Sequence, residues 1–201
     1  MNLESKKAKY EIEDDIFTIF PKIYKKQRGV SNSLFVNRKE IIKYSNKNNK
    51  IIEILDITEE FIKTKYYSNW YPLVITNECK IFYDDDTIKE RSDEYNKFLL
   101  NFNKVKSMYE QIEKEYSLFK ETTDLTFGDM TSNNILVNSD ITDFRIIDIN
   151  SIDLSENVGI LGSLNLKYVL GYYSYGHVVD GFFDKLNIDK LLEEFNDFNI
   201  S

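Results

Sequence analysis

Cysteine, histidine, proline and glycine are scarce in this chain of 201 residues, which has one Cys, one His, two Pro and seven Gly. The single Cys79 excludes an internal disulfide framework and a cysteine-based zinc cluster. The single His177 argues against Ser-His-Asp and Cys-His catalysis and against a histidine-rich metal site. Any catalysis by this chain is therefore expected to depend on carboxylates.

Long apolar runs and basic clusters are also missing. No apolar run approaches the ~18 residues of a membrane span, and the segment "MNLESKKAKYEIEDDIF" has no apolar signal core. We therefore expect no membrane span and, with one cysteine, a reducing cytoplasmic setting. The net charge is −8 and no basic block is longer than "YKKQR", so a nucleic-acid partner is not expected.

What the chain does contain is enough apolar side chain for a core, at 42% hydrophobic and 14% aromatic residues. This composition excludes a disordered chain. The length suits one large domain or two small lobes. No repeat and no low-complexity linker is present.

The first half of the chain is rich in short segments of β-branched and aromatic residues. Residues 17–45 predict strands at 17–26, 33–37 and 40–45, and two more strands are predicted at 70–76 and 79–84. Residues 50–67 are ambiguous. They suit a helix face, or a strand over 51–57 followed by a helix that begins at Thr58.

The second half has a helical pattern over 86–121, where apolar residues recur every three or four positions. Two short apolar runs at 134–138 and 144–149, joined by "SDIT", predict a β-hairpin. Two further helices are predicted near 163–172 and 187–196. This order of elements indicates an α+β, two-lobed arrangement.

Polar residues cluster around the hairpin in the segment "GDMTSNNIL" and in the run that ends at Asp148. Asp129 and Asn134 are five residues apart, and Asp148 follows fourteen residues later. Mg²⁺ with nucleotide phosphates takes one or two carboxylates plus substrate oxygens, and an amide oxygen completes the set without adding charge. A second carboxylate would orient an acceptor hydroxyl. Taken singly, each of these residues also suits an ordinary polar turn.

The segment "LTFGDMTSNNILV…FRIIDIN" resembles the loop H-G-D-x-x-x-x-N-I-L, hairpin, I-D of aminoglycoside phosphotransferases, choline kinases and related bacterial small-molecule kinases. It is nearest to small kinases of bacterial capsule and surface-sugar clusters, to which "LNLKYVLGYYSYG" is also similar. The resemblance implies a protein-kinase-like fold, with a β-rich N-lobe over 1–83 and a mainly helical C-lobe over 84–201. It implies Asp129 as catalytic base and Asn134 and Asp148 as Mg²⁺ ligands. Phe127 replaces the loop histidine of the family.

The resemblance also implies a phosphate loop in "QRGVSNSLFV", a strand lysine held by a glutamate, and backbone groups near 76–83 that hold the adenine. The residues expected to bind the nucleotide are Ser31, Asn32, Ser33, Lys43, Glu59 and Glu60, with Glu59 and Glu60 as alternative partners of Lys43.

The function implied is an ATP- and Mg²⁺-dependent phosphotransferase that acts on a hydroxyl of a small molecule, such as a sugar or a surface-polysaccharide precursor. A nucleotide-binding pseudokinase with a regulatory or scaffold role is the alternative, because Phe127 cannot donate the hydrogen bond of the family histidine. A protein kinase is a further alternative. It is less favoured because Asp148 is followed by Ile-Asn and no D-F-G or A-P-E motif occurs.

Overall fold

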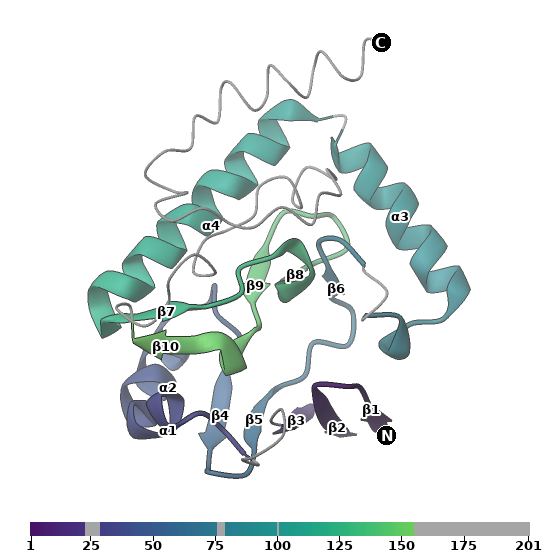
Figure 1. Ribbon diagram of the computed structural model, residues 1–201. Helices are drawn as coiled ribbons and strands as arrows, with labels where there is room; N and C mark the ends of the chain where they lie inside the picture. Colours follow the sequence, from purple (N-terminus) through teal and green to yellow (C-terminus); the bar gives the residue numbers. More distant parts are fainter. Residues whose placement is uncertain (23–28, 76–78, 100, 155–201) are drawn as a thin grey trace.

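The computed structural model describes residues 1–22, 29–75, 79–99 and 101–154. The chain is a mixed α/β fold with a β-rich N-terminal sheet followed by helices (Figure 1). The helices predicted near 163–172 and 187–196, and the segment 164–176, lie outside the described residues. The predicted division of the chain at residues 83 and 84 stays a prediction.

The N-terminal sheet has five antiparallel strands in the order β1-β2-β3-β5-β4. The strands are β1 Asn2–Glu4, β2 Ala8–Glu13, β3 Ile16–Pro21, β4 Ile54–Ile57 and β5 Ile62–Lys65. The strand predicted at 17–26 corresponds to β3, whereas β1 and β2 were not predicted. One face of the sheet carries the stacked rings of Tyr10 and Phe17, whose centroids are 5.5 Å apart.

Two helices, α1 (Asn32–Val36) and α2 (Arg38–Lys47), cross over between β3 and β4. The strands predicted at 33–37 and 40–45 are therefore wrong. Ser31 caps α1, because its side chain accepts a hydrogen bond from the backbone N–H of Leu34 at 3.2 Å. On α2, Ile41, Tyr44 and Ser45 are buried at helical spacing. Burial on one helical face outweighs the β-branched and aromatic composition that favoured strands.

The turn between β4 and β5 decides the ambiguity over 50–67. A strand over part of 51–57 is confirmed by β4, but Thr58 begins a turn and not a helix. The Thr58 hydroxyl oxygen accepts hydrogen bonds from the backbone N–H groups of Glu60 and Phe61, at 3.2 and 3.1 Å. Gly29, with φ of +120°, lies so close to this turn that a Cβ there would be 2.1 Å from the carbonyl oxygen of Glu59.

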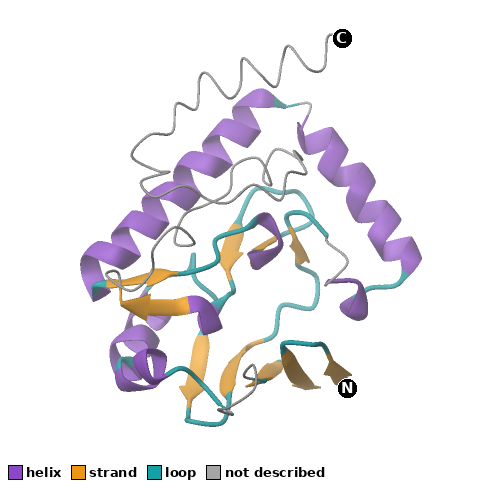
Figure 2. Cartoon of the chain, viewed as in Figure 1, coloured by secondary structure: helices purple, strands orange, loops and turns teal. Residues whose placement is uncertain are grey.

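After β5 the chain forms β6 (Tyr71–Pro72), within the strand predicted at 70–76. It then forms a short 3₁₀ helix, η1 (Cys79–Phe82), in place of the strand predicted at 79–84. The single helix predicted over 86–121 is two helices, α3 (Asp85–Leu99) and α4 (Phe102–Thr123). The side chain of Asn101 begins α4 by accepting a hydrogen bond from the N–H of Lys104 at 3.1 Å. Figure 2 shows α3 and α4 as two long helices that diverge from each other.

The predicted hairpin is confirmed as β8 (Ile135–Val137) and β9 (Phe144–Ile146), which form a three-stranded sheet with β6. A second small sheet pairs β7 (Leu125–Phe127) with β10 (Ile152–Leu154). Figure 1 shows these sheets between α4 and the N-terminal sheet. Ile146 of β9 links the hairpin to the segment that leads into β4, since its carbonyl oxygen accepts a hydrogen bond from the N–H of Ile52 at 3.0 Å. No helix in the described part of the chain is long and apolar enough to cross a membrane.

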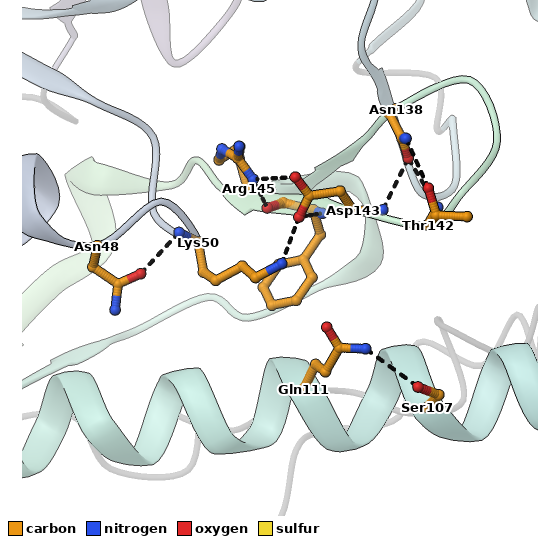
Figure 3. A network of polar contacts seen from close by, with 9 residues as sticks. Asn48, Lys50, Ser107, Gln111, Asn138, Thr142, Asp143 and Arg145 are labelled. Carbon is orange, nitrogen blue, oxygen red and sulfur yellow. Dashed lines mark hydrogen bonds and ion pairs between the residues drawn. The ribbon is translucent and has the colours of Figure 1, made fainter.

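The turn of the β8–β9 hairpin is held in place by its own hydrogen bonds (Figure 3). Oδ1 of Asn138 accepts from the N–H groups of Thr142 and Asp143, at 2.8 and 2.9 Å. Asp143 in turn pairs with Lys50 at 2.5 Å and with Arg145 at 2.9 Å. These contacts therefore fix the turn that joins β8 to β9.

Candidate functional site

The candidate site begins where β7 leaves the core. The three residues of β7 are buried, and the backbone N–H of Gly128 then donates to the carbonyl oxygen of Ser151 at 2.8 Å. A Cβ at position 128 would lie 2.9 Å from that oxygen, closer than real Cβ atoms come, so the close approach requires glycine. The next residue, Asp129, has an exposed side chain. The β7–β10 pairing thus fixes the point at which this carboxylate emerges.

Asn134 joins Asp129 to Asp148. Its side-chain Nδ2 donates to the backbone oxygen of Asp129 at 2.8 Å and lies 3.5 Å from Oδ2 of Asp148. The hairpin register explains the second contact, because the N–H of Ile147 donates to the carbonyl of Asn134 at 3.0 Å. The structure therefore brings Asp129, Asn134 and Asp148 together at one end of the β8–β9 hairpin. Their chemical roles stay predictions.

Asp148 is the perturbed group of the site. Its side chain is partly buried at the start of the 3₁₀ helix η3 (Ile149–Ser151). The pKa of Asp148 is raised from 3.8 to about 6, chiefly by burial. The nearby charge of Asp129 contributes to this rise, while the Ser151 hydroxyl and the Lys7 ammonium lower the pKa. The ionised form of Asp148 is consequently costly until a cation neutralises it.

The donor set fits a hard divalent cation. Asp148 supplies a carboxylate, and the amide of Asn134 has a carbonyl oxygen beside the Nδ2 that lies 3.5 Å from Oδ2 of Asp148. Mg²⁺ is usually held by one or two carboxylates together with substrate phosphates and water. Among the described residues, no group of three or more His, Cys, Asp or Glu could hold a metal ion. A cation here would therefore need the amide and oxygens from a bound ligand.

Lys7 is a cation of the site that sequence reasoning missed. It lies in the turn between β1 and β2, where the Ser5 hydroxyl oxygen accepts from the N–H groups of Lys7 and Ala8, each at 3.1 Å. Its ammonium is near enough to Asp148 to lower the pKa of that carboxyl. The alternation of apolar and polar residues over Ala8–Glu13 is the signal that would have revealed β2 and its preceding turn.

The residues predicted to bind the nucleotide are on other elements than expected, and their role stays a prediction. Ser31, Asn32 and Ser33 are the cap and first turn of α1 and not a loop between strands. Lys43 is on helix α2, not on a strand. Its side chain is 63% exposed, and its ammonium lies 3.8 Å from a carboxylate oxygen of Glu40.

Glu59 and Glu60 are exposed in the β4–β5 turn and not on a helix. Within the described residues, neither of them pairs with Lys43. No described hydrogen bond or ion pair joins any of these six residues to Asp129, Asn134 or Asp148. The backbone expected to hold an adenine lies partly outside the described residues and otherwise in and beside η1.

Phe127, the residue at the place of the family histidine, is fully buried. Its ring packs against Phe119 of α4 with centroids 4.7 Å apart. In β7 its backbone partner is Ile152 of β10. Phe127 therefore anchors the loop through the core and offers no hydrogen bond to it.

Comparisons with known proteins include a likeness to a solved structure. No family model matches the chain, and no curated protein matches it. Among solved structures, the chain is similar to a choline/ethanolamine kinase family protein from Mesorhizobium loti, with 13% sequence identity and a TM-score of 0.39. The match covers 86% of this chain and 68% of the other. A likeness this low does not define what this chain does.

Proposed function

We propose that this protein is an ATP- and Mg²⁺-dependent phosphotransferase that acts on a hydroxyl of a small molecule. The observation that carries the proposal is the position of the Asn134 amide, which contacts Asp129 and Asp148 at once. The amide reaches the backbone oxygen of Asp129 and the carboxylate of Asp148, so the three residues lie at one end of the hairpin. A sugar or a surface-polysaccharide precursor is proposed as the acceptor from the sequence resemblance alone.

In this proposal the two carboxylates have different tasks. Asp129 is exposed, so an acceptor hydroxyl can reach it, be oriented by it and give up its proton to it. Asp148 and Asn134 hold Mg²⁺ with the nucleotide phosphates. When bound, the ion neutralises the charge of the phosphates. Lys7 would add a positive charge on the side of the β1–β2 turn. The protein contributes position and electrostatic stabilisation, which are the main terms in phosphoryl transfer.

The test replaces Asp129 by asparagine, which keeps the size of the side chain and removes the base. Loss of a general base reduces turnover by roughly 10²- to 10⁴-fold. We expect Asp129→Asn to lose ATP consumption with a panel of sugar acceptors while it keeps the Mg²⁺-dependent thermal shift caused by ATP. The control is Asp56→Asn, a change of an exposed carboxylate on β4. Undiminished turnover of Asp129→Asn would remove the assignment.

A nucleotide-binding pseudokinase remains the second candidate, and the burial of Phe127 favours it. A buried phenylalanine holds the loop by packing but cannot orient a carboxylate by a hydrogen bond. This candidate predicts an ATP-dependent thermal shift and no turnover on any acceptor. Turnover by the wild-type protein that depends on Asp129 would exclude it.

A further inference from the structure

We draw no further inference here: the strongest candidate, the turn between β1 and β2 that carries Lys7, belongs to the site already described and is linked to Asp148, within the described residues, only through the effect of its charge on the pKa of that carboxyl.

Discussion

Replacing Asp148 by asparagine should stabilise this protein at neutral pH. Burial raises the pKa of Asp148 from 3.8 to about 6, so the folded state holds the proton more tightly than the unfolded chain does. Below pH about 4 both states are protonated and the carboxyl costs nothing. Between pH about 4 and 6 the unfolded chain loses this proton while the folded state keeps it, so stability falls, and the loss reaches about 3 kcal/mol once the pH exceeds 6. An asparagine side chain at this position has no proton to lose and avoids this loss.

Urea denaturation of the metal-free protein between pH 3 and pH 8 measures the effect. The free energy of unfolding of Asp148→Asn, relative to the wild type, should increase by about 3 kcal/mol across this range. The control Asp56→Asn changes an exposed carboxylate and should show no such pH dependence. Added Mg²⁺ should stabilise the wild type more than Asp148→Asn. A stability difference that does not vary with pH, or that favours the wild type more at pH 8 than at pH 4, would refute the reasoning.

Two further substitutions test the frame of the site. Phe119→Ala should lower the free energy of unfolding by about 3–5 kcal/mol, because this fully buried ring packs against Phe127. Leu118→Ala, at a 43% exposed neighbour, should change it by less than about 0.5 kcal/mol in the same urea titration. Gly128→Ala should force the Asp129 loop away from Ser151, since the new Cβ would lie 2.9 Å from a backbone oxygen. We expect it to lose the Mg²⁺-dependent ATP thermal shift, and a normal shift would contradict this.

The meeting of Asn134 and Asp148 was predictable from the sequence because it depends on local pairing. Once the runs on either side of "SDIT" form a hairpin, antiparallel pairing places Ile135 opposite Ile146. Asn134 must then lie opposite Ile147 and next to Asp148. Few other arrangements of so short a hairpin bury its apolar residues. The position of Asp129 needed one more step, the β7–β10 pairing, which the sequence did not reveal.

The secondary-structure predictions that were wrong depended on contacts between distant segments. Lys43 was placed on a strand because its neighbours are β-branched or aromatic, but these residues bury one face of α2. Burial of this kind depends on the partner surface, which composition does not describe. Glu59 and Glu60 were placed on a helix, although Thr58 caps a turn in the same way that it would cap a helix. In both cases the local signals are compatible with two structures, and packing chooses between them.

Buried charges in the described part of the chain divide into those that the fold satisfies and those that it does not. Glu115 is 6% exposed, but the Tyr44 hydroxyl donates to it at 2.8 Å, so it serves the packing of α2 on α4. Asp148 and Arg91 have weaker compensation, since Asn134 is 3.5 Å from the first and two donors of the second are unpaired. Sequences that fold well remove such costs unless a ligand supplies the missing partner. For Asp148, at the proposed Mg²⁺ site, a bound cation would supply this partner.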